Sequence, residues 1–125
     1  MNKTIALRTE LNRLFKTITT NVYHEDKPDN AGYPYLVYES SELTYEYGKT
    51  QYQLEVNIVD HGEDSSVVEN LSDSTQAALN KYYFINPYIE FTVYKGQRLT
   101  VKEEDKQIIR RRMLFEIQLH ELKGE

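Results

Sequence analysis

Residues 51–59 alternate between polar and apolar side chains, and this period of two constrains the fold more than any other feature of the chain. The apolar members are Tyr52, Leu54, Val56 and Ile58. Successive side chains of an extended strand point to opposite faces, so these four would share one face. The segment therefore predicts a half-buried strand in a sheet that keeps one polar face.

Three further segments predict strands of the same kind. The first spans 35–41 and follows Pro34, which has no amide hydrogen for a ladder and so suits the start of a strand. The second spans 88–94, and the last runs through 112–120, where Leu114 is the one apolar residue on the polar side. We expect loops at 42–50 and 95–107 between these strands.

Two segments have the periodicity of amphipathic helices. Apolar residues recur every three or four positions over 4–19 and again from Ser66 to about Asn80. Ser66 and Glu69 have the spacing of a capping box at the start of the second helix. The expected fold class is α+β: a single domain over 1–125 with a four-stranded, mainly antiparallel sheet and two helices packed on one face.

The composition restricts the possible functions. The chain has 125 residues, a net charge of −5 and no cysteine. Disulfides and thiolate chemistry are therefore excluded, and an acidic chain is poorly suited to gripping nucleic acid. No apolar run approaches the ~20 residues of a membrane span, so we expect a soluble cytoplasmic product with no membrane partner. The eleven tyrosines fit either ordinary strand preference or a protein interface.

The sequence shows no constellation typical of a catalytic or metal site. His24, His61 and His120 lie in separate expected elements, without a spacing that places two ligands on one helix face. The glycines are isolated, unlike those of a phosphate-binding loop, and the serines lack the glycines of a nucleophile elbow. We therefore expect no metal, no cofactor and no enzymatic activity.

Arg110, Arg111 and Arg112 form the one concentrated group of charges. Strand alternation sends Arg110 and Arg112 to the polar face, where they could be solvated, contact acidic residues of a neighbouring subunit, or contact DNA. A ring needs two different surfaces that meet. The candidate acidic residues are Asp60, Glu63, Asp64, Glu103, Glu104 and Asp105, and Tyr45 and Tyr47 in the 42–50 loop are further interface candidates.

The order of these segments resembles the tail terminator, or tail completion, proteins of long-tailed bacteriophages and prophages. The likeness covers nearly the whole chain and rests on order, length and the aromatic-Pro-Tyr start of the first strand. The quoted segments are Tyr33-Pro34-Tyr35-Leu36-Val37-Tyr38, Val59-Asp60-His61-Gly62, Ile89-Glu90-Phe91-Thr92-Val93-Tyr94 and Met113-Leu114-Phe115-Glu116-Ile117. A Trp that often follows the second strand in this family is absent here, where Val59 precedes Asp60.

The resemblance implies a structural protein that forms a hexameric ring, caps the tail tube and joins tail to head. Its expected partners are other copies of the chain, the major tail tube protein and the head connector, with DNA only passing through the channel. Its expected locations are the bacterial host cytoplasm during assembly and then the virion tail. Two alternatives stay open: another neck or head-completion protein, and a small adaptor that binds a peptide at a sheet edge.

Overall fold

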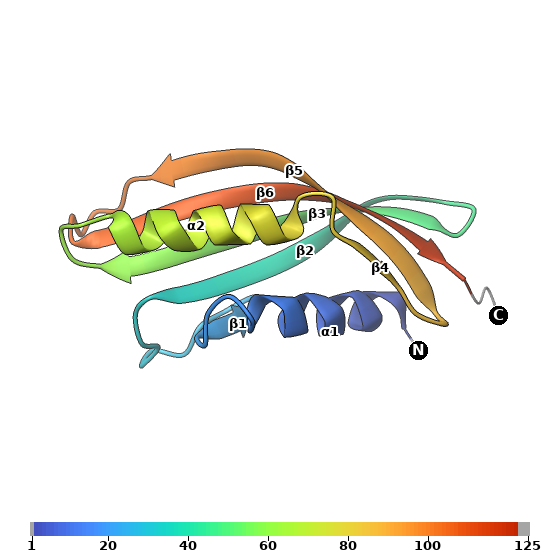
Figure 1. Cartoon of the computed structure of the whole chain (residues 1–125), viewed down its shortest axis with the longest axis horizontal. Coiled ribbons are helices and arrows are strands. Elements are labelled where there is room, and N and C mark those ends of the chain that lie inside the picture. The colour runs from blue at the N-terminus through green and yellow to red at the C-terminus, as the bar shows by residue number, and fades with distance from the viewer. Residues whose placement is uncertain (1, 123–125) are drawn as a thin grey trace.

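The computed structural model describes residues 2–122 and shows one six-stranded sheet with two helices. The elements in chain order are α1 (Lys3–Phe15), β1 (Val22–His24), β2 (Tyr35–Glu46), β3 (Lys49–His61), α2 (Ser66–Leu79), β4 (Tyr83–Ile85), β5 (Ile89–Val101) and β6 (Ile108–Glu121). The strand order is β1-β2-β3-β6-β5-β4. Both helices lie on the same side of the sheet, which curls around them (Figure 1). No helix among residues 2–122 is long and apolar enough to cross a membrane.

The expected four-stranded, mainly antiparallel sheet is wrong, although the fold is α+β overall. The sheet has six strands and is mixed, because β1 pairs with β2 in parallel and β4 adds to β5. The two extra strands have three residues each. A segment that short shows no readable period, and its extended form depends on pairing with a strand already in place.

The expected loops at 42–50 and 95–107 are largely strand. β2 and β3 continue to a two-residue turn at Tyr47 and Gly48, whose φ angles are 51° and 78°. Positive φ at both central residues is the geometry of a type I′ hairpin turn, which continues the twist of its strands. β5 likewise extends to Val101, so only residues 102–107 connect it to β6.

A bulge in β5 breaks the alternation of side chains after the predicted part of the strand. The register shifts between Lys95 and Arg98, and a Cβ at Gly96 would lie 2.6 Å from the carbonyl oxygen of Leu114. Only glycine permits that approach without a shift of the backbone. The bulge also turns Arg98 to the helix side, where its guanidinium contacts Asp73 at 2.6 Å and Glu69 at 2.9 Å.

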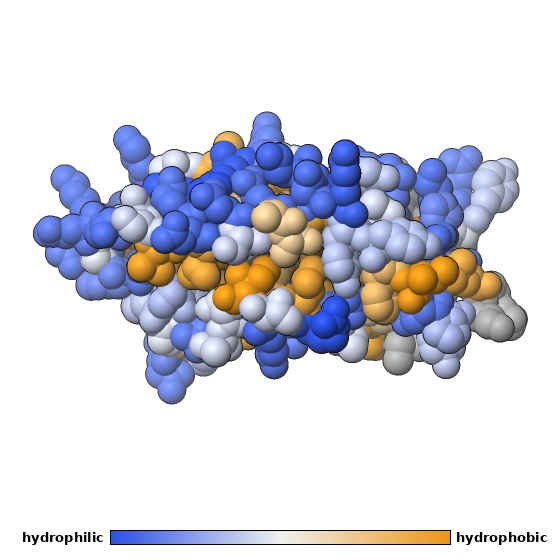
Figure 2. All heavy atoms as spheres, in the orientation of Figure 1, coloured by the Kyte–Doolittle hydropathy of each residue, from blue (hydrophilic) through white to orange (hydrophobic). Residues whose placement is uncertain are grey.

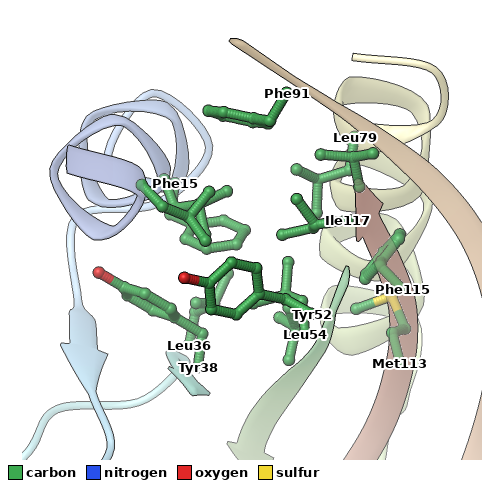
Figure 3. Packing of buried hydrophobic residues seen from close by; sticks show 14 of the residues in the cluster. Phe15, Leu36, Tyr38, Tyr52, Leu54, Leu79, Phe91, Met113, Phe115 and Ile117 are labelled. Atoms are coloured by element: carbon green, nitrogen blue, oxygen red, sulfur yellow. The ribbon is translucent and has the colours of Figure 1, made fainter. Parts of the chain in front are cut away.

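The core lies between the sheet and the helices, and it contains the apolar residues predicted from alternation. Leu54, Val56 and Ile58 of β3 have no exposed surface, and Met113, Phe115, Ile117 and Leu119 of β6 are buried beside them. Figure 3 shows the hydroxyls of Tyr38 and Tyr52 directed toward α1. There Tyr38 donates to Asn12 at 3.1 Å, and the Tyr52 hydroxyl lies 2.9 Å from that of Thr4.

Both helices differ from expectation at one end. α1 ends at Phe15 rather than residue 19. The predicted capping box of α2 is wrong, because the Ser66 amide donates to Asp64 while the Glu69 carboxylate is bound by Arg98 and Arg111. Hydrogen bonding to Arg98 lowers the pKa of Glu69. The Glu69 side chain therefore connects α2 to the sheet and does not cap the helix.

Ser72 of α2 carries a buried hydroxyl with no hydrogen-bond partner. Replacing it with Ala removes that uncompensated group, and alanine also has the higher helix propensity. We therefore expect Ser72→Ala to raise the free energy of unfolding by about 1 kcal/mol. Urea denaturation at neutral pH measures the change, with Ser74→Ala as the control on the same helix. A loss of stability in Ser72→Ala would show that the hydroxyl has a partner.

Candidate functional site

The outer face of the sheet, opposite the helices, carries two of the three consecutive arginines. Arg110 Nε lies 2.6 Å from Glu103 Oε1, and Arg112 Nε lies 3.3 Å from Asn57 Oδ1. Arg111 points to the other side and reaches Glu69 of α2. The split follows from the alternation of β6, so Arg110 and Arg112 are presented together on one surface.

The acidic candidates gather at one end of the sheet, beside these arginines. The 60–64 and 103–107 segments are brought together there, because His61 pairs with Ile108 and Gly62 donates to Gln107 at 2.8 Å. Figure 2 shows this end as strongly hydrophilic, at the left of the view. Within residues 2–122, Arg110 is already bound to Glu103 of the same chain, and contact of Asp60, Glu63, Asp64 and Glu104 with a neighbouring subunit stays a prediction.

One corner of the outer face is apolar, in contrast to the polar outer face that the alternation predicts. Tyr35 and Val59 are paired across β2 and β3, point away from the core, and are only 3% and 1% exposed. The segment before β2 covers Tyr35: the Tyr33 ring lies 5.7 Å from the Tyr35 ring, and Lys27 Nζ lies 5.9 Å from the centre of the same ring. The available signal was Val59 itself, an apolar residue at a polar position of the alternation.

A hollow of about 250 Å³ lies beside this corner. Its walls carry charges of both signs, from residues that include Glu25, Lys27, Glu55 and Arg110. Among residues 2–122, no three His, Asp or Glu side chains are placed to hold a metal ion. Because its charges are mixed, the hollow does not favour the binding of an ion of one sign.

The β2–β3 hairpin extends past the helices at the opposite end of the molecule (Figure 1). Lys3 of α1 anchors its base, through contacts of 2.9 Å to both Glu42 and Thr50 and by lying over the Tyr45 ring. Tyr47 at the tip is 96% exposed. Both tyrosine candidates are therefore exposed, Tyr45 at 57% with its ring against Lys3 and Tyr47 almost completely.

Besides the outer sides of the three-residue strands β1 and β4, two longer stretches of the sheet lack a neighbouring strand within residues 2–122. β1 covers β2 only at 36–38, which leaves the β2 edge, residues 39–46, open. β4 and the chain before it cover β5 as far as Lys95, which leaves the β5 edge, residues 96–101, open. Unpaired backbone groups along a strand form a template for another strand. The sheet can therefore be extended at both sides.

Comparison with known proteins gives a fold relationship. No protein-family model and no curated protein matches the chain. A chain in a solved structure described as the virion of a native gene transfer agent particle is similar, with a TM-score of 0.69 and 9% sequence identity. The match covers 93% of this chain and 91% of that chain, so the two share a fold over nearly their whole lengths.

Proposed function

We propose that this chain is a structural protein of a phage-like particle and, within it, the tail terminator: a ring, most simply of six copies, that caps the tail tube and joins tail to head. The observation that carries the proposal is the fold shared with a chain of a gene transfer agent virion over 93% of the present chain. The resemblance in segment order to tail terminators supports the finer assignment.

The open sheet edges of β2 and β5 are compatible with assembly. Two different open edges on one sheet can each take a strand, and two unlike surfaces are what a closed ring of identical copies requires. The net charge of −5 suits a channel wall that does not retain passing DNA. The partners in this proposal are further copies, the major tail tube protein and the head connector, and the protein carries out no catalysis.

Native mass spectrometry and electron microscopy with the major tail tube protein of the same particle test the assignment. We expect the chain, a 14.8 kDa monomer, to form a ring of six copies either alone or on the tube. Tubes assembled with the chain present should stop growing and carry a ring at one end, whereas tubes assembled alone should vary in length.

Three other outcomes would contradict the assignment. Binding only to the portal or head adaptor would make the chain another neck protein. A stable monomer at tens of micromolar that binds a peptide at a sheet edge would make it an adaptor module. Tubes of unchanged length, with no bound ring, would remove the tail terminator role.

A further inference from the structure

We infer that neighbouring copies join by continuing the sheet: the β2 edge (39–46) of one copy pairs antiparallel with the β5 edge (96–101) of the next. This inference rests on the proposed function, because it names the contact that would build the ring. It does not need the three arginines or the acidic end of the sheet as the interface.

The backbone of the β2 edge is directed outward at alternate residues. The Leu36 amide donates to the Asn21 carbonyl at 2.8 Å, and the Tyr38 carbonyl accepts from the Glu25 amide at 2.8 Å, both on the side away from β3. In an antiparallel pair, alternate residues point away from the partner strand. Ser40 and Glu42 therefore direct their N–H and C=O groups outward, where residues 2–122 supply no backbone partner.

The same reasoning identifies the outward residues of the β5 edge. Val93 exchanges backbone bonds with Tyr82 and Lys81 at 2.9 and 2.8 Å, so its groups point away from β6. Residues opposite each other in antiparallel strands either bond to each other or both point away. Ile58 lies opposite Leu36, which points away from β3, so Ile58 points away from β2 and bonds to Arg111 of β6. Arg111 therefore points away from β5, and Thr100, which lies opposite Arg111, points outward from the sheet.

The strand directions allow the two edges to meet. β2 is antiparallel to β3, β3 to β6, and β6 to β5, so β2 and β5 run in opposite directions within one copy. The two open stretches lie at opposite ends of the sheet, because Glu42 is level with Val93 and Thr100 is level with Leu36. A second copy in the same orientation, displaced along the strands, therefore presents its β5 edge antiparallel to the β2 edge. Such a contact joins two different surfaces, so it repeats from copy to copy and closes into a ring when the rotation allows.

The charges on the two edges are complementary. The β2 edge contains Glu39, Glu42 and Glu46 and no basic residue, whereas the β5 edge contains Arg98 and no acidic residue and is flanked directly by Lys95 and Lys102. Within residues 2–122, Glu42 and Arg98 already form ion pairs, but the other four are exposed and form none. Pairing of two β2 edges would oppose like charges, so the unlike edges are favoured.

Proline at an outward position of each edge tests the contact. Ser40→Pro and Thr100→Pro each remove an N–H that serves neither β3 nor β6, so the fold should survive, as thermal melts would show. We expect each variant to lose the ring and run as the 14.8 kDa monomer. In an equal mixture, the intact β5 edge of Ser40→Pro can pair with the intact β2 edge of Thr100→Pro. The mixture should therefore form dimers with one copy of each variant and no larger assembly.

Charge reversal provides a second test that leaves the backbone unchanged. The pair Glu39→Lys with Glu46→Lys makes both edges basic, and the pair Lys95→Glu with Lys102→Glu makes both acidic. Each double variant alone should lose the ring, and mixing them should restore rings with alternating copies. Rings of parental mass from every variant alone would overturn the edge inference and leave the proposed function standing. An unmodified chain that stays monomeric on the tube protein would overturn both.

Discussion

Replacing Val56 with Asp is expected to abolish cooperative folding. Val56 lies at the centre of β3 with no exposed surface, opposite Met113 of β6 and Tyr38 of β2. A carboxylate at this position would be removed from water without a partner. Single domains are stable by only about 5–15 kcal/mol, and an unpaired buried charge is among the few changes that cost about 4 kcal/mol or more.

Circular dichroism during heating measures the effect, and Gln53→Asp is the matched control. Gln53 is three residues earlier on the same strand and exposed on the outer face, so its variant should melt near the parental temperature. If Val56→Asp also melted cooperatively near that temperature, the side chain would not be in the core and the register of β3 would be incorrect.

Replacing Glu10 with Gln is expected to destabilise the fold in a pH-dependent way. Glu10, in α1, is only 6% exposed. Its carboxylate accepts from Arg13 at 2.9 and 2.7 Å and also from the Tyr82 hydroxyl beyond α2. Glutamine retains the shape but loses the charge, and hydrogen bonds to a charged group contribute roughly 1.5–3 kcal/mol. A loss of about 2 kcal/mol is expected at neutral pH.

The pH dependence follows from the position of this carboxyl. The hydrogen bonds from Arg13 hold the pKa of Glu10 below its ordinary value of 4.5. The folded state therefore binds the proton less readily than the unfolded state. Ionised Glu10 contributes its full stability at pH values above the ordinary pKa of 4.5. The contribution is lost as the pH falls through the lowered pKa in the folded protein, so the parent and Glu10→Gln should converge in acid.

Urea denaturation at several pH values measures the difference without the salt that guanidinium would add. Glu104→Gln is the control, because Glu104 is exposed and forms no ion pair within residues 2–122. The free energy of unfolding of Glu104→Gln should equal that of the parent at every pH. A constant difference between the parent and Glu10→Gln from neutral to acidic pH would mean that the charge of Glu10 contributes nothing to stability.

The local sequence was sufficient for the long elements and for the orientation of their side chains. Alternation in β3 and β6 identified buried residues such as Leu54 and Phe115, and it placed Arg110 and Arg112 on the outer face. These predictions succeed because a half-buried strand must alternate to bury one face, whatever its neighbours are. The helical stripes likewise identified α1 and α2 before any partner was known.

The surfaces available for assembly depended on tertiary structure. β1 and β4 are too short to show a period, yet their pairing decides which parts of the β2 and β5 edges remain open. The sequence made Glu103 a candidate for contact with a neighbouring subunit, and the fold places it 2.6 Å from Arg110 of its own chain. The sequence by itself therefore determined which residues are extended or helical and which face each presents, because these depend on periods within one segment. Only the tertiary structure decided the strand order, the open edges and the partner of each charge, because these depend on segments far apart in the chain.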